Sequence, residues 1–312
     1  MSFSLVRLIP GDPVQNLLGE RGGTPEQIEQ IKKNFGLDKS LPEQYYLFIR
    51  NAISGNMGRS VVSQRGVTEE FLARFPATLE LGFVALIWSS LVGIPLGIIA
   101  AYKRNSVWDY GVTGVSLLGF SMPIFWWGLL LILVFSVNLG WFPVSGRISV
   151  MFDVPMKTGF YLIDSWSQGK DAFFSALQHL VLPAIVLGTI PLAILTRITR
   201  SSLLEVMNED YIRAAKARGV STGKIILKHA LSNALLPIIT ILGFLVGSIM
   251  TGAVLTESIF SWPGVGKWLI KSIEARDYPV IQGGILYISA SIVVVNIIMD
   301  VVYTFLNPRL KK

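Results

Sequence analysis

The chain has 312 residues, of which 52% are hydrophobic and only 15% are charged, and it contains no cysteine. A soluble domain usually carries about a quarter charged residues, so this composition and a mean hydropathy of +0.56 exclude an ordinary soluble protein and favour a membrane protein. The lack of cysteine excludes disulfides and thiolate metal sites, and the net charge of +7 fits basic cytoplasmic loops better than a nucleic-acid partner.

The N-terminal quarter contains one short apolar piece and one polar region. Residues 1–9 are too short to cross a bilayer and lack the parts of a signal peptide. We interpret them as the end of a first transmembrane helix whose beginning is absent from the sequence. Residues 10–75 carry mixed charge and two helix starts, Thr24-Pro25 and Ser40-Leu41-Pro42-Glu43. The pattern predicts a small helical extracytoplasmic insert with helices over 25–34 and 42–53.

A transmembrane domain is expected over residues 76–308. Five long apolar runs in it predict membrane spans, at about 77–102, 109–138, 173–198, 234–256 and 280–306.

The second of these runs contains a proline that should bend its helix. Residues Ser121, Met122, Pro123 and Trp126 lie at this point. They are candidates for lining a path for solute. Aromatic packing around a simple kink is the alternative interpretation.

Basic residues set the predicted orientation. They gather at Lys103 and Arg104, in the segment 197–228 and in the tail 309–312. Since Lys and Arg concentrate in cytoplasmic loops, we place these three on the cytoplasmic side and the loops 140–172 and 257–279 outside. With the first helix restored, the full-length protein would have six spans and both termini in the cytoplasm.

The most distinctive stretch is residues 205–233. Apolar positions three and four apart predict two short helices, each with one apolar side. Gly219 follows the first helix, where a left-handed residue would end it, and Ser221 and Thr222 are candidate caps for the second. An ordinary cytoplasmic loop would explain these features equally well.

No catalytic or metal-binding pattern is found in the sequence. His179 and His229 are the only histidines and do not have metal-ligand spacing. There is no P-loop and no GxSxG, which argues against an enzyme. We also find no ionisable residue in the middle of a predicted span, which argues against a proton- or sodium-coupled transporter.

Longer motifs carry a resemblance to a known family. Ala214-Ala215 followed by Gly219 resembles the EAA signature of ABC importer permeases. The stretches RFPATLELG at 74–82, SMPIFWWG at 121–128, LPAIVLGTIPLA at 182–193 and LTESIFSWPGVGKW at 255–268 extend the match. Together they resemble the B-type inner-membrane permease of dipeptide and oligopeptide ABC importers. Two positions depart from the generic signature: Arg213 stands where Glu is usual, and the next proline, Pro237, comes late.

The resemblance implies a fold and a set of partners. The fold would be an all-α polytopic membrane bundle of the type I ABC importer class, in the inner membrane of a bacterium. Partners would be a second homologous permease, two ATP-binding cassette ATPases and an extracytoplasmic peptide-binding protein, besides lipid. ATP and Mg would be used by the ATPases, and this chain would bind no cofactor or metal.

The resemblance also implies a site and a solute. The residues expected to dock on the ATPase are Glu209, Asp210, Arg213, Ala214, Ala215, Arg218, Gly219 and Val220. We call the stretch 205–233 that contains them the coupling segment. The solute would be a dipeptide or short peptide. Haem, nickel and glutathione stay open within the same architecture, and a secondary transporter or channel is the alternative of a different class.

Overall fold

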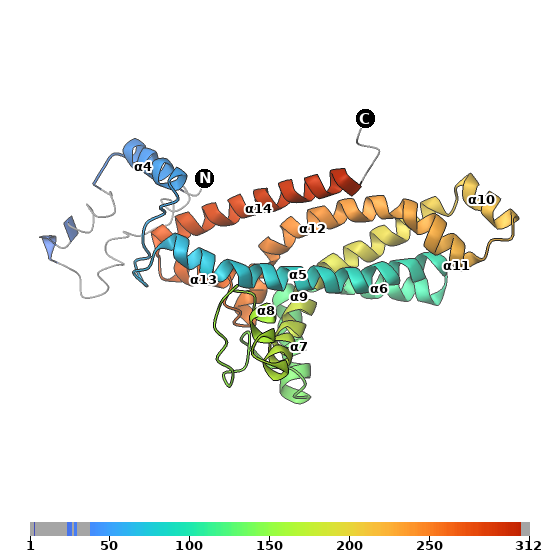
Figure 1. Cartoon of the computed structure of the whole chain (residues 1–312), viewed down its shortest axis with the longest axis horizontal. Helices are drawn as coiled ribbons and strands as arrows, with labels where there is room; N and C mark the ends of the chain where they lie inside the picture. The colour runs from blue at the N-terminus through green and yellow to red at the C-terminus, as the bar shows by residue number, and fades with distance from the viewer. Residues whose placement is uncertain (1–2, 4–23, 27, 30–37, 307–312) are drawn as a thin grey trace. The chain divides into compact units, whose positions relative to one another are not determined.

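A computed structural model describes residues 3, 24–26, 28–29 and 38–306 (Figure 1). Within these residues the fold is helical, and the only β contact is an isolated bridge between Arg59 and Gly66. The helices are α4 (Leu41–Ile53), α5 (Val67–Tyr102), α6 (Val107–Ser121), α7 (Ile124–Leu131), η1 (Ile132–Asn138), α8 (Tyr161–Trp166), α9 (Lys170–Val206), α10 (Asp210–Ala217), α11 (Thr222–Lys224), η2 (Ile225–Ala230), α12 (Leu231–Ile259), α13 (Val265–Glu274) and α14 (Tyr278–Leu306). The prediction of an all-α bundle is confirmed.

Four helices of the described chain are long and apolar enough to cross a membrane, and the paired helices α6 and α7 with η1 make a fifth if they form one span. This pair is bent by 107°. The predicted bend at Pro123 is therefore present. It is sharper than a kink within a continuous helix, because α6 ends at Ser121 and α7 starts after the proline.

Several helices are longer than the apolar runs that predicted them. Helix α5 begins at Val67, within the region predicted as polar insert, because Val67 and Phe71 bury an apolar face ahead of the membrane run. Helix α4 begins within one residue of the prediction, and the Glu43 carboxylate accepts a hydrogen bond from the Ser40 backbone N–H at 3.3 Å, one half of the expected capping box. The described positions from 25 to 29 are helical, and the rest of the predicted helix 25–34 lies outside the described residues.

The described residues form two compact units, one of those up to Pro76 with residues 263–291, and one of residues 77–262 with 292–306. In the first unit Val67 and Phe71 pack with Val265, Trp268 and Val280. Trp268 Nε1 donates a hydrogen bond to the buried Glu70 carboxylate at 2.6 Å. This unit therefore includes α13, a helix inside what the sequence indicated only as a loop.

The second unit is built around α9, which packs against α6, α7, α8 and α12. Its apolar core includes Leu81 of α5, Leu180 and Leu187 of α9, and Ile249 of α12. Gly97 lets α5 approach α9 closely, since a Cβ there would lie 2.6 Å from the Thr196 carbonyl oxygen. Figure 1 shows α10 at the end of α9, beyond this core. The second unit carries the coupling segment and is the part of the molecule that the functional argument needs.

Candidate functional site

The coupling segment begins at the end of α9 and leads into the longest helix of the described chain. Helix α10 spans Asp210–Ala217, as one short helix was expected to do. The second expected short helix is instead the first part of a continuous 38-residue helix, Thr222–Ile259. The reason is that buried apolar residues continue past the predicted end, from Ile225 and Ala230 to Ala234 and Ile238.

The turn between α10 and α11 has the hydrogen bonds of a Schellman motif. The Gly219 N–H donates to the Lys216 carbonyl at 2.9 Å, and the Val220 N–H donates to the Ala215 carbonyl at 3.2 Å. Gly219 has φ +76. A Cβ at this position would meet no atom within 4 Å, so the glycine is required by its left-handed backbone and not by crowding.

One face of α10 anchors it to the bundle. Ile212 and Ala215 are buried and pack with Ala101 of α5, Leu203 of α9 and Ile225 of η2. Val220 packs against the same cluster. Of the residues predicted to dock on a partner, Ala215 and Val220 thus face the protein's own core, and their contribution is to hold α10 in place.

The other face of α10 is open to solvent. The exposed residues predicted for docking are Glu209, Asp210, Arg213, Ala214, Arg218 and Gly219. The Arg213–Asp210 ion pair spans 3.4 Å, with side chains 72% and 94% exposed. An exposed pair of this kind contributes little to stability. Both side chains can therefore leave this pair and bind charged groups of a partner with little loss of folding free energy.

A second contact joins α10 to the long helix. The Asn233 side-chain amide donates to Tyr211 Oη at 2.7 Å, and it also donates to the His229 carbonyl at 3.2 Å. The Tyr211 hydroxyl also donates a hydrogen bond to the His229 carbonyl at 3.4 Å. Together with the apolar anchor, these bonds make α10 and the start of the long helix one rigid projection.

The residues predicted to line a solute path lie at the bend between α6 and α7. Ser121, Pro123 and Trp126 are exposed there, and Met122 is half-buried. The next residue, Trp127, packs against the apolar cluster that contains Leu131 and Phe260, and its Nε1 donates to Thr189 Oγ1 at 3.1 Å. Trp126 is exposed in the isolated chain, and its contact with a solute stays a prediction.

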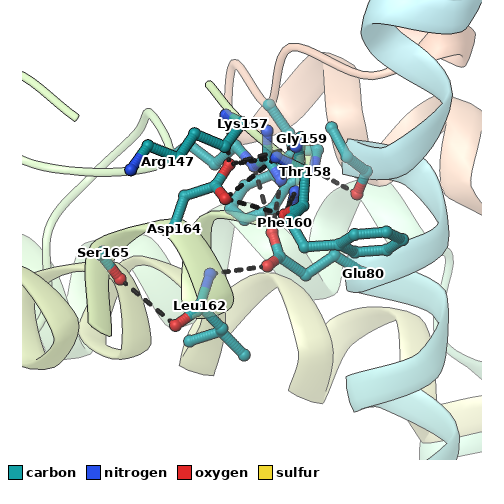
Figure 2. Close-up of polar contacts among 11 residues, drawn as sticks. Glu80, Arg147, Lys157, Thr158, Gly159, Phe160, Leu162, Asp164 and Ser165 are labelled. Carbon is teal, nitrogen blue, oxygen red and sulfur yellow. Dashed lines mark hydrogen bonds and ion pairs between the residues drawn. The ribbon is translucent and has the colours of Figure 1, made fainter. Parts of the chain in front are cut away.

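A buried ionic cluster lies among α5, α8 and the connection between η1 and α8 (Figure 2). Arg147 donates to Glu80 Oε2 from Nε at 3.1 Å and from Nη2 at 2.6 Å, and Nη2 also donates to the Gly159 carbonyl at 2.7 Å. Glu80 Oε1 accepts from the Leu162 N–H at 2.8 Å. Both charged side chains are almost fully buried, at 5% and 3% exposure.

Two aromatic rings complete this group. The Arg147 guanidinium carbon lies 4.2 Å from the Tyr161 ring centroid and 5.5 Å from that of Trp262. These distances allow cation–π attraction. We call Glu80, Arg147, Gly159, Tyr161 and Trp262 the Arg147 cluster.

Asp164 shapes the backbone next to the Arg147 cluster. Its carboxylate accepts hydrogen bonds from the backbone N–H groups of residues 157, 158 and 159 and from the Thr158 hydroxyl at 2.8 Å. Burial alone would raise the pKa of Asp164, but these hydrogen bonds outweigh it and hold the pKa below its ordinary value. Figure 2 shows the carboxylate facing this turn of backbone.

Comparison with known proteins identifies the family. Residues 93–312 match the family described as binding-protein-dependent transport system inner membrane component, and residues 1–82 match the description of its N-terminal part. The chain belongs to this family. It is thus a multi-pass inner-membrane permease of a binding-protein-dependent transport system.

Curated relatives of the permease are similar over its whole length. The di/tripeptide transport system permease protein DppB of Pseudomonas aeruginosa is 52% identical over 312 residues, which cover 100% of this chain and 93% of that one. The dipeptide transport system permease protein DppB of Haemophilus influenzae is 54% identical with the same coverage.

A solved structure supports the fold of the permease. A chain of the MetNI methionine ABC transporter, in an inward-facing conformation, aligns with a TM-score of 0.58 and 16% identity, covering 76% of this chain and 96% of that chain. The type I importer permease fold expected from the sequence is therefore confirmed.

Sequence reasoning missed the buried charges of the permease. Glu80 and Glu257 lie near the ends of the predicted spans, where charge is easily tolerated, yet both are almost completely buried. Asp109 is buried as well and pairs with Arg200 at 2.6 Å. The sequence could not indicate these ion pairs, because Arg147 and Arg200 lie 67 and 91 residues from the carboxylates with which they pair.

The buried carboxylates do not form a metal centre in the described chain. Among the described residues no group of three or more His, Asp or Glu side chains is placed to hold a metal ion. The acidic groups named above are instead paired with arginine or held by hydroxyl and backbone donors.

Proposed function

We propose that the permease imports dipeptides or short peptides across the cytoplasmic membrane. The solute class is inferred from curated relatives that are 52% and 54% identical over the full chain and are named as peptide permeases. Haem, nickel and glutathione are the competing solutes within the same architecture.

The energy for this import would come from partner subunits. The sequence has no nucleotide-binding P-loop. In this proposal the permease itself catalyses no hydrolysis and binds no cofactor, and the attached ATPases use the ATP and Mg. The observation that supports this most directly is α10, which is fixed to the bundle on one face and presents charged residues on the other. A rigid projection of this kind can transmit a movement from an attached subunit.

The complete assembly would contain this permease, a second homologous permease, two ATP-binding cassette ATPases and an extracytoplasmic peptide-binding protein. Basic residues near α10, including Arg197, Lys216 and Lys224, favour a cytoplasmic position for the coupling segment. Both termini of the full-length protein would then lie in the cytoplasm. The residues Ser121, Met122, Pro123 and Trp126 remain our candidates for the solute path.

Reconstitution tests this proposal. The permease is co-expressed with the second permease and both ATPases, placed in vesicles with the binding protein, and supplied with a labelled dipeptide. We expect uptake that requires ATP and stops with a non-hydrolysable analogue. Unlabelled dipeptide should compete, whereas glutathione, haem and nickel should not. Uptake that persists without ATP would contradict the coupling to ATPases, and competition by glutathione but not by dipeptide would contradict the solute.

A further inference from the structure

Arg147 connects segments that are distant in the sequence. Its guanidinium bonds to Glu80 of α5 and to Gly159 ahead of α8, and it lies against the rings of Tyr161 and Trp262. Trp262 follows the C-terminal end of α12. One side chain therefore ties the loop of residues 143–166 to α5 and to the end of α12.

Two further hydrogen bonds join the same three segments. The Gly146 N–H donates to the Phe260 carbonyl at 2.9 Å, and Trp262 Nε1 donates to the Ala77 carbonyl at 2.9 Å. The loop, the start of the apolar part of α5 and the end of α12 are thus joined pairwise. Any movement of α5 away from this loop must break the ion pair.

The chemistry of the pair makes it either intact or fully broken. Both Arg147 hydrogen bonds to Glu80 are charge-assisted and come from a planar fork that lysine lacks. Since both groups are withdrawn from water, loss of one partner leaves a buried charge uncompensated, which is strongly unfavourable. A partly opened state is therefore disfavoured, as expected for a two-state contact.

We propose that Arg147 is a positioning residue for transport, whose ion pair with Glu80 keeps the loop of residues 143–166 closed against α5 and α12 and breaks in one step of the transport cycle. This inference rests on the proposed function, because it needs a cycle with two states. A purely structural pair would instead stay intact in every state.

The cysteine-free sequence allows a direct test by thiol labelling. Ser165 of α8 is fully buried, and its Oγ donates to the Leu162 carbonyl at 3.5 Å. The N–H of the same Leu162 donates to Glu80, so Ser165 lies close to the ion pair (Figure 2). A thiol introduced by Ser165→Cys reports opening of the loop through its reaction with a membrane-impermeant maleimide. Ser167, exposed two residues later, provides the matched control as Ser167→Cys.

The measurement uses the assembled transporter in vesicles. We expect slow labelling of Ser165→Cys at rest and faster labelling during ATP turnover with the binding protein present. Adding Arg147→Lys or Glu80→Gln should raise the resting rate by about tenfold or more. The first variant loses the two-bond fork to Glu80, and the second leaves the buried Arg147 charge without its partner. ATP hydrolysis at rest should rise relative to the peptide-stimulated rate. The control Lys157→Ala removes an exposed positive charge from the same loop and should change neither rate.

Two results would overturn the inference. One is a labelling rate that stays the same at rest and during turnover. The other is an unchanged resting rate in both single variants. If the single variants assemble poorly, the double variant Glu80→Gln/Arg147→Gln leaves no unpaired charge and should still label rapidly. Labelling does not depend on which solute is carried, so failure of peptide uptake alone would contradict the proposed function and leave the role of Arg147 standing.

Discussion

At the scale of single residues, Gly219 and Arg147 illustrate two kinds of constraint. Gly219 is needed for a backbone conformation, and its hydrogen bonds are local, within residues 215–220. The sequence therefore located this turn correctly. Arg147 is needed for a partner 67 residues away, and nothing near it in the sequence distinguishes it from an ordinary loop arginine. Local chemistry was predictable, and long-range pairing was not.

Replacing Gly219 should weaken coupling without unfolding the bundle. Gly219→Ala forces a Cβ into the left-handed region at a cost of about 1–2 kcal/mol, which should displace α10 and reduce co-purification of the ATPases. Gly223→Ala is the matched control, because Gly223 also has free space for a Cβ but has no positive φ. Gly219→Asn should restore binding in part, since Asn tolerates this conformation. Equal ATPase recovery with Gly219→Ala and Gly223→Ala would refute the role of the turn.

The pKa of Asp164 predicts a pH-dependent contribution to stability. Its folded-state pKa is lowered, so its carboxylate stabilises the fold above the unfolded pKa of about 3.9, and this contribution is lost as the pH falls through the folded pKa. Asp164→Asn should cost about 1–3 kcal/mol at pH 7. The difference from the unmodified protein should shrink toward pH 3. Thermal unfolding in detergent between pH 3 and pH 7 measures this, and a constant difference would show that ionisation is not involved.

At the scale of helices, the apolar runs predicted that helices exist but not where they end. Helix α5 begins ten residues before the predicted span, because Val67 and Phe71 contribute an apolar face outside the membrane run. The long helix from Thr222 contains the second predicted short helix for the same reason. Hydropathy averages over a window and does not register single buried residues at helix ends. The bend at Pro123 was predictable because proline acts locally, although its 107° angle was not.

The close contact between α5 and α9 makes a separate prediction. Gly97→Ala would place its Cβ 2.6 Å from both the Thr196 carbonyl oxygen and Thr199 Cβ, and the resulting overpacking should lower stability by about 1–3 kcal/mol. Gly111 of α6 has no atom within 4 Å of a built Cβ. Gly111→Ala should therefore leave the melting temperature in detergent unchanged or slightly higher. A similar loss of stability in both variants would contradict the tight α5–α9 packing.

At the scale of the whole molecule, the sequence predicted the fold class and the family, and the alignment to relatives over the full chain bears this out. The sequence did not predict which segments form each of the two compact units. The turn and helix after Trp262 belong to the same compact unit as residues up to Pro76, since Trp268 bonds to Glu70 and packs with Phe71. Such grouping depends on contacts between distant segments, which a single sequence does not display.

The continuous helix from Thr222 to Ile259 has a mechanical consequence. With 38 residues at about 1.5 Å each, it is roughly 57 Å long. It starts three residues after Gly219, and the Trp262 ring that lies against Arg147 comes three residues after its end. If an ATPase docks on α10 as proposed, a push or twist applied there would be passed along one helix, through the π-helical turn η2 and past Pro237, to the far ion pair, with no intervening loop to absorb it.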